Sequence, residues 1–397
     1  MKLTSLIETL TAFEPQGKDF ISLYLNAGAN EQGRDEYQIW LGREFSDAAK
    51  NYPEDSPEAK NFNRTIEKIQ NFLDAEVDPA TNGIAVFAVV GEEEDEFFQT
   101  AQLDEPFPNN RFFIFDRPHI FPLVRIVEQN PKYVVLWADT NKASIYIFGG
   151  ENTLNVETET RAKIEEIQNE KTNRSQVGGW SQARYQRHVE NFHLQHAKET
   201  VEEVEKLMRD KKIEHLILCG DETGVMPTLR PQLSKEAEEK VVAVLNMSQY
   251  ASEQEIREKT REAMNVENAT KDKARVERVF NAAKAAAGLG TLGAEDTLAA
   301  LSNGQVEELV LSAEFSAIKY NRERIEKVLA DYAPGDDNSA SDELPEAGEA
   351  RQIADELLIR ALNSAAKIVF IEDASLLKEA GGVGAVLRYN INATANG

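Results

Sequence analysis

Short apolar runs alternate with segments of helical periodicity along the whole chain, and this alternation restricts the fold to the α/β class. In the first third the strand-like runs are Phe20–Leu25, Gly83–Val90 and Arg111–Phe115. Ala59–Leu73 lies between them and carries apolar side chains at helical spacing. The opening segment, MKLTSLIETLTAFEP, places Glu8 within a short apolar run, so it predicts an amphipathic helix and not a signal peptide.

The middle and last thirds repeat this alternation. Lys132–Ala138 and Ser144–Phe148 predict a strand hairpin, because turn-forming residues separate them. The other elements predicted in the middle third are a long helix over 183–210, a strand over 216–219, a helix over 236–245 and helical sequence over 253–287. Those of the last third are a helix over 295–301 and strands over 308–311, 367–371 and 385–391. The sequence therefore predicts three tandem α/β domains, over 1–131, 132–270 and 271–397.

Composition indicates a soluble, acidic protein. The formal net charge of −25 argues against general affinity for nucleic acid, because protein and polyanion repel at long range. The acidic segment 333–348 is rich in Pro and Gly and predicts a mobile loop. The lone cysteine, Cys219, excludes an intrachain disulfide, and no apolar run is long enough to span a bilayer. We expect a cytoplasmic protein that does not contact membranes.

One basic segment stands out against this acidic background. Lys171–Val189 contains no Asp or Glu but includes Arg174, Arg184 and Arg187. At its centre, Gly178 and Gly179 precede Trp180; adjacent glycines allow a backbone to approach another surface closely. Arginines three residues apart on a helix can bind phosphates together, and an exposed indole can stack on a base. The segment therefore predicts a loop that contacts RNA.

Plainer interpretations of this segment stay open. A Gly-Gly pair often marks an ordinary surface turn, and Trp180 could instead fold back onto the helix that follows. His193 and His196 share a helix face, but no third metal ligand accompanies them, so a solvated helix face is expected. Gly381–Gly384 is similar to a phosphate loop but precedes a strand. We expect no metal, no cofactor and no nucleophilic hydrolase chemistry.

Gly178–Arg187 resembles the Gly-Gly-Gln loop of archaeal and eukaryotic peptide-chain release factors, which an Arg-aromatic-x-Arg helix start follows at the same spacing. Gly293–Leu298 and Gly381–Tyr389 are similar to the third domain of that family, and FISLYL and NGIAVF to its first. The likeness extends over nearly the whole chain in the same order. It implies a first domain that approaches the decoding centre and a second that reaches the peptidyl-transferase centre.

The departures from the family change the expected function. Trp180 occupies the position of the family's hydrolytic glutamine, and an indole N–H donates one hydrogen bond and accepts none. Gln182 lies two residues further on and could substitute only if the loop shifts register. The family's stop-codon motif is missing; Ser56–Asn61 occupies roughly its place. The resemblance therefore implies a factor that does not terminate at stop codons, similar to the bacterial members of the family.

The leading hypothesis is a non-enzymatic factor that occupies the ribosomal A site and protects idle ribosomes. The resemblance implies contacts with 16S and 23S ribosomal RNA, and delivery of the factor by elongation factor Tu or a related translational GTPase. We expect a monomer, because nothing in the sequence suggests self-association. The expected contacts in the peptidyl-transferase centre are Arg174, Gly178, Gly179, Trp180, Gln182, Arg184 and Arg187. Those in the decoding centre are Lys60, Asn61 and Arg64.

Two other hypotheses stay open. The chain could be a rescue factor that hydrolyses peptidyl-tRNA, with Gln182 orienting a water. It could also be an adaptor that uses this fold to bind proteins only.

Overall fold

The structure is a computed structural model that describes residues 3–14, 17–28, 37–79, 81–92, 96–103, 105–139, 142–149, 180–248, 250–285, 287–331 and 349–390. Its fold is α/β, as the sequence predicts. The described residues form two compact units. The terminal unit combines an N-terminal part, up to Asn130, with a C-terminal part from Lys271; the central unit extends from Pro131 to Thr270. The division into three domains stays a prediction.

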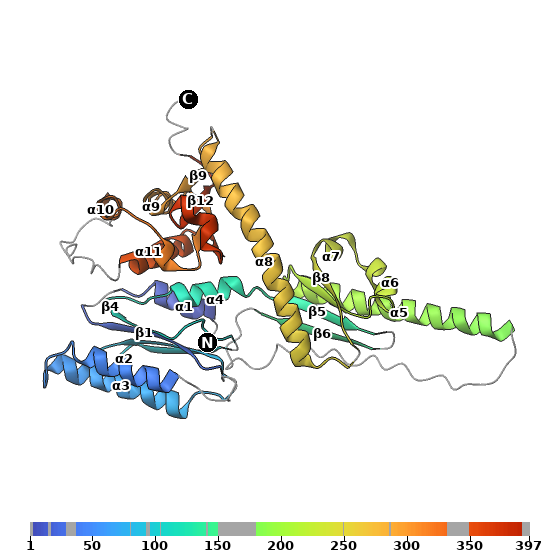
Figure 1. Ribbon diagram of the computed structural model, residues 1–397, viewed down its shortest axis with the longest axis horizontal. Coiled ribbons are helices and arrows are strands. Elements are labelled where there is room, and N and C mark those ends of the chain that lie inside the picture. The colour runs from blue at the N-terminus through green and yellow to red at the C-terminus, as the bar shows by residue number, and fades with distance from the viewer. Residues whose placement is uncertain are drawn as a thin grey trace. The chain divides into compact units, whose positions relative to one another are not determined.

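The N-terminal part is an antiparallel sheet of order β3-β2-β1-β4. Its strands are β1 (Phe20–Asn26), β2 (Gly83–Val89), β3 (Phe98–Leu103) and β4 (Arg111–Phe115). Helices α2 (Tyr37–Ala49) and α3 (Pro57–Ala75) cover one face, and α1 (Leu3–Thr11) and α4 (Phe121–Gln129) the other (Figure 1). Side chains alternate between the faces, so Ile21 and Leu23 pack on α2 and α3 while Phe20 and Tyr24 pack on the opposite side.

The C-terminal part is a mixed sheet of order β11-β10-β12-β9. Its strands are β9 (Gly290–Leu292), β10 (Val306–Ser312), β11 (Lys367–Ile371) and β12 (Val383–Leu387). Its helices are α9 (Ala294–Ser302), α10 (Arg322–Asp331), α11 (Glu349–Asn363) and the short 3₁₀ helices η2 (Phe315–Ala317) and η3 (Ala374–Ala380). Apolar residues of α1 and α4 share one buried cluster with those of α9 and α11, so the two parts of the terminal unit have a common core.

The central unit is built on a sheet of order β6-β5-β7-β8. The strands are β5 (Tyr133–Ala138), β6 (Ala143–Phe148), β7 (Leu216–Gly220) and β8 (Val241–Asn246); β5, β7 and β8 are parallel. One face packs on α5 (Trp180–Lys211), α6 (Met226–Leu229) and their neighbours η1 (Arg230–Gln232) and α7 (Lys235–Glu239). The other packs on the first half of α8 (Glu253–Lys284).

The predicted helix over 236–245 is wrong. Its first residues form the short helix α7, but the chain then enters strand β8, which pairs in parallel with β7. The run VVAVLN contains three β-branched valines, and β-branched residues favour a strand over a helix. The strand predicted over 385–391 begins earlier, at Val383, and ends at Leu387. The acidic segment 333–348 lies outside the described residues.

Among the described helices, none combines the length with the apolar character that crossing a membrane requires.

Cys219 lies in the middle of the central sheet and is fully buried, and burial raises the pKa of its thiol to about 12. A thiol that is both inaccessible and protonated does not attack disulfides. We therefore expect the native chain to show no reaction with an aromatic disulfide reagent at pH 8 within an hour, and one thiol per chain after unfolding in urea. Rapid labelling of the native chain would contradict this placement of β7.

Candidate functional site

The basic segment is only partly described. Arg174, Gly178 and Gly179 lie outside the described residues. Trp180 is the first residue of helix α5. Gln182, Arg184 and Arg187 follow within its opening turns, and for these four residues the backbone is described but the side chains are not.

The helical register of α5 places these backbone positions on different sides. At 3.6 residues per turn, positions 180, 184 and 187 share one side of the helix, while position 182 lies on nearly the opposite side. The residues of α5 in the buried cluster of the central unit are Ala197, Val201, Val204 and Met208, and they define the side that packs on the sheet. In this register position 184 lies on roughly the opposite side, whereas position 187 lies about 40° from Val201, at the margin of the packed side. Trp180 begins the helix about 24 Å before His196 along the axis.

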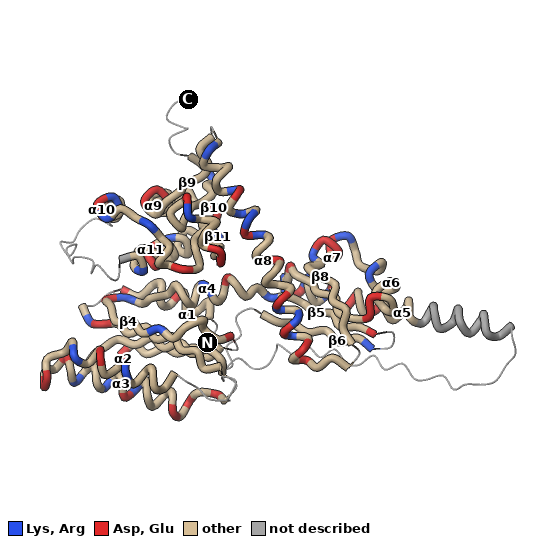
Figure 2. Tube along the Cα trace, in the orientation of Figure 1, with Lys and Arg blue, Asp and Glu red and all other residues tan. Residues whose placement is uncertain are grey.

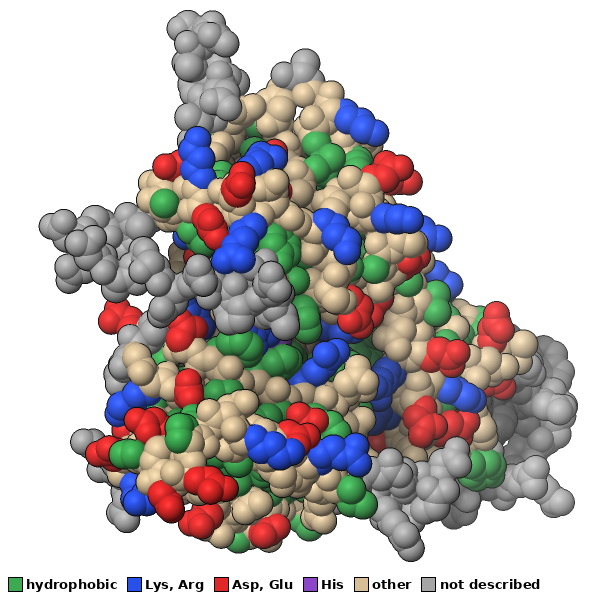
Figure 3. Space-filling view, turned by 60° about the vertical axis from the view of Figure 1, so that its left-hand side comes forward, with side chains coloured by type: hydrophobic (Ala, Val, Ile, Leu, Met, Phe, Trp, Pro, Cys, Tyr) green, Lys and Arg blue, Asp and Glu red, His purple; other side chains and the backbone are tan. Residues whose placement is uncertain are grey.

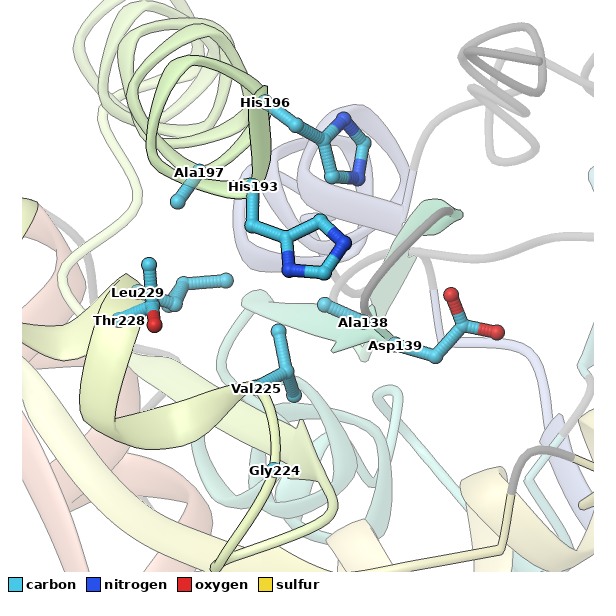
Figure 4. Close-up of a pocket in the computed structure, with 9 residues that line it drawn as sticks. All are labelled: Ala138, Asp139, His193, His196, Ala197, Gly224, Val225, Thr228 and Leu229. Carbon is cyan, nitrogen blue, oxygen red and sulfur yellow. The ribbon is translucent and has the colours of Figure 1, made fainter. Parts of the chain in front are cut away.

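A small pocket lies where α5 meets the carboxyl ends of strands β5 and β7 (Figure 4). Its volume is about 30 Å³, which accommodates an ordered water but not a nucleotide or a peptide. It is lined by Ala138, Asp139, His193, His196, Ala197, Gly224, Val225, Thr228 and Leu229. Figure 4 shows both imidazole rings projecting from α5 on the same side. The pocket is therefore too small to be an active-site cleft for such a substrate.

The expectation of a solvated helix face is wrong for His196. His196 is 5% exposed, and no hydrogen bond of normal geometry reaches either ring nitrogen from the described residues. Burial lowers its pKa below the usual 6.5, against the opposing effect of the Asp139 carboxylate. His193, by contrast, is half-buried. Within the described ranges, no three His, Cys, Asp or Glu side chains are arranged to hold a metal ion.

The three residues expected at the decoding centre lie in the first half of α3. Ser56 caps this helix, since its hydroxyl accepts a hydrogen bond of 3.0 Å from the backbone N–H of Ala59. Lys60 and Arg64 are exposed one turn apart on the same side. Arg64 donates to the backbone carbonyl of Glu92, and Asn61 is half-buried beside Lys60. The structure thus brings Lys60 and Arg64 together, but any contact with RNA stays a prediction.

Charged side chains of both signs are interspersed over the described surface. Figure 2 shows acidic and basic residues alternating along α2, α3 and α8, and Figure 3 shows the same mixture on one face of the molecule. The face in Figure 3 shows no broad basic groove. The basic character that the sequence concentrates in 171–189 therefore has no equivalent on the face that Figure 3 shows.

Two family models match most of the chain. Residues 118–265 match bacterial archaeo-eukaryotic release factor family 10, and residues 269–391 match eRF1 domain 3. Among curated proteins, peptide chain release factor subunit 1 of Thermococcus kodakarensis is 23% identical, over 98% of each chain. The protein of the same name from Methanocaldococcus jannaschii is also 23% identical, over 98% of this chain and 96% of its own.

Solved structures give weaker matches. The crystal structure of the archaeal translation termination factor aRF1 is 17% identical, covers 98% of this chain and 97% of its own, and superposes with a TM-score of 0.26. A model of ribosome-bound archaeal Pelota and ABCE1 is 13% identical, with 98% and 94% covered and a TM-score of 0.38. Superpositions of this quality carry no argument about function.

The two family models follow one another along the chain, and the longest unmatched part is residues 1–117. The chain belongs to the archaeo-eukaryotic release-factor-like family, in its bacterial branch. It is a release-factor-like translation factor.

Proposed function

We propose that the chain binds the ribosome, occupies its A site and acts as a hibernation factor that does not hydrolyse peptidyl-tRNA. The observation that carries this proposal is Trp180, which occupies the glutamine position of the family's loop and opens helix α5. Family membership supports a role in translation. The likeness to the hibernation factor Balon, drawn from the loop and from the missing codon-reading motif, supports the specific role.

The register of α5 supports a role of Trp180 in binding. Trp180, Arg184 and Arg187 occupy positions on one side of the helix, so an aromatic ring and two guanidinium groups can approach the same surface. Rings stack on bases, and arginine binds phosphates in a bidentate manner. We propose 23S ribosomal RNA in the peptidyl-transferase centre as the target, with Gly178, Gly179 and Arg174 completing the contact. Lys60, Asn61 and Arg64 are proposed to contact 16S ribosomal RNA.

The charge of the chain supports delivery by a protein partner. A formal charge of −25 repels RNA at a distance, and the basic segment contains only a few cations. A GTPase that binds both the factor and the ribosome would overcome this repulsion. We propose elongation factor Tu or a related translational GTPase for this step, which takes place in the cytoplasm.

The same register argues against the hydrolytic alternative. Position 182 lies on nearly the opposite side of α5 from position 180, so a glutamine at 182 does not replace one at 180 unless the start of the helix shifts. An indole in place of the amide lacks an acceptor for a hydrogen bond from water.

Release of labelled peptide from purified stalled ribosomes tests this point. We expect the chain to release no more peptide than buffer does, and Gln182→Ala to behave identically. An archaeal release factor on a stop codon serves as the positive control for the assay. Release by the chain that disappears in Gln182→Ala would instead establish the rescue function.

Sedimentation of the tagged chain from growing and starved cells tests ribosome binding itself. The proposal expects the chain to sediment with ribosomes, more strongly after starvation. A chain that stays in the supernatant at modest salt in both states would favour the protein-only adaptor.

A further inference from the structure

A buried polar pair joins the N-terminal and C-terminal parts of the terminal unit. His119 lies just before α4 and is 1% exposed, while Asp355 lies on α11 and is 4% exposed. The Nδ1 atom of His119 is 2.6 Å from Oδ2 of Asp355. These residues are 236 positions apart in the sequence. The contact therefore fastens two parts of the unit that carry separate sheets.

Asp355 also caps helix α4 from across the junction. Its Oδ1 atom accepts hydrogen bonds of 3.0 Å from the backbone N–H groups of Ile120 and Phe121, which begin that helix. Ile120, at the N-cap position, provides no side-chain cap of its own. A carboxylate at a helix N-terminus satisfies free N–H groups and interacts favourably with the helix dipole. The orientation of α4 thus depends on a residue of α11.

The surroundings of His119 favour its neutral form. The imidazole ring lies among the rings of Tyr24, Phe113, Phe121 and Phe315. Its Nε2 atom has no hydrogen-bond partner among the described residues. The Nδ1–H group therefore donates to Asp355, and a second proton at Nε2 would be buried without an acceptor.

Charged groups reach His119 from each neighbouring element. Asp355 and Arg351 come from α11, Arg111 from β4, and the Tyr24 hydroxyl from β1 donates to the carbonyl of His119. Burial lowers the pKa of His119 below its usual 6.5; Arg351 and Arg111 lower it further, and Asp355 opposes them. When the contact between α4 and α11 opens, His119 becomes solvated and its pKa returns toward 6.5. Below pH 6.5 this open state therefore binds more protons than the closed state. The junction is therefore most stable above pH 6.5 and weakens as the pH falls.

We propose that the His119–Asp355 contact is a proton-sensitive latch, which holds α4 against α11 at neutral pH and loosens the junction on acidification. A second attachment, at the edge of the junction, provides a comparison without histidine. Arg125 donates to both carboxylate oxygens of Glu372, at 2.8 and 2.9 Å, and to the carbonyl of Ala313 at 3.0 Å. Glu372 is 59% exposed, so this pair is solvated and insensitive to histidine protonation.

Hydrogen exchange of the full chain at pH 7.5, 6.5 and 5.5 tests the latch, after correction for the intrinsic exchange rates. We expect peptides over 119–126 and 351–358 to exchange several-fold faster at pH 5.5 than at pH 7.5, because protonation of His119 favours the open junction. A peptide over 62–72 in α3 should not change. His119→Asn keeps an N–H donor near the Nδ1 position, but the new side chain does not titrate. In this variant the backbone amides of peptides 119–126 and 351–358 should therefore have the same corrected exchange rates at the three pH values. Glu372→Gln should keep the wild-type pH response.

Three results would overturn the proposal: no acceleration in the wild type, an unchanged pH response in His119→Asn, or equal acceleration in α3. Should His119→Asn fail to fold, titration of the His119 ring by NMR in the wild-type chain decides the matter. A midpoint below 6.5 supports the latch, and one at or above 6.5 refutes it. Neither measurement involves ribosomes, so the latch and the proposed function can fail independently.

Discussion

Asp355→Ala is expected to lower the free energy of unfolding of the terminal unit by about 3–5 kcal/mol, because three buried donors lose their acceptor and each unsatisfied group costs about 1–3 kcal/mol. The substitution removes the acceptor for the Nδ1–H group of His119 and for the N–H groups of Ile120 and Phe121. It also removes one of the two carboxylates, Asp355 and Asp116, that raise the pKa of the Arg351 guanidinium, which is 4% exposed and whose pKa burial lowers to about 10. Urea unfolding at pH 7.5, with the midpoint and slope compared, measures the change.

Glu372→Gln is the matched control for this substitution. It removes a carboxylate from the same junction, but an exposed one, and exposed ion pairs contribute about 0–1 kcal/mol. Comparable losses in the two variants would show that Asp355 has no special role in joining the two parts of the unit.

Trp180→Ala is expected to weaken ribosome binding tenfold or more. Stacking of an aromatic ring on a base contributes about 1–3 kcal/mol, and a loss of 1.4 kcal/mol corresponds to a tenfold change in the dissociation constant. Titration of a fluorescently labelled chain with vacant ribosomes gives the constant directly. Because Trp180 is the first residue of α5, about 24 Å from His196, the substitution should leave the unfolding transition unchanged.

Trp180→Phe distinguishes stacking from a general effect of the loop. It keeps an aromatic ring but removes the indole N–H, so affinity should fall less than threefold, on the scale of one weak hydrogen bond. Equal losses in the two variants would mean that the N–H group and not the ring makes the contact. An unchanged affinity in Trp180→Ala would remove this residue from the proposed site.

Strands buried on both faces were the easiest elements to predict. In β1, helices cover both faces, so FISLYL is apolar at every position except Ser22 and can be recognised from the sequence alone. The error at β8 has another cause, since a short apolar run alone does not distinguish a strand from a helix. Helices α2, α4, α6, α10 and α11 and strands β3 and β9 were not predicted.

The residues that carry the proposals also differ in whether the sequence alone can identify them. Gly178, Gly179 and Trp180 are adjacent in the chain, so the sequence alone identifies the loop and its departure from the family. His119 and Asp355 lie in unremarkable sequence, 236 positions apart, and no spacing relates them. The burial of His196 was missed because its solvent exposure depends on the β5–β6 hairpin and on α6, not on its own helix.

The order of residues along the chain was by itself enough to predict the α/β class, most strands, the long helices and the basic segment, because periodicity and adjacency are properties of neighbouring residues. The tertiary structure alone decided which sheet each strand joined and that the two ends of the chain share a core. It also decided that a histidine and an aspartate from those ends meet inside that core. Burial and pairing between distant residues arise only when separate segments pack together, and no pattern of neighbours encodes them.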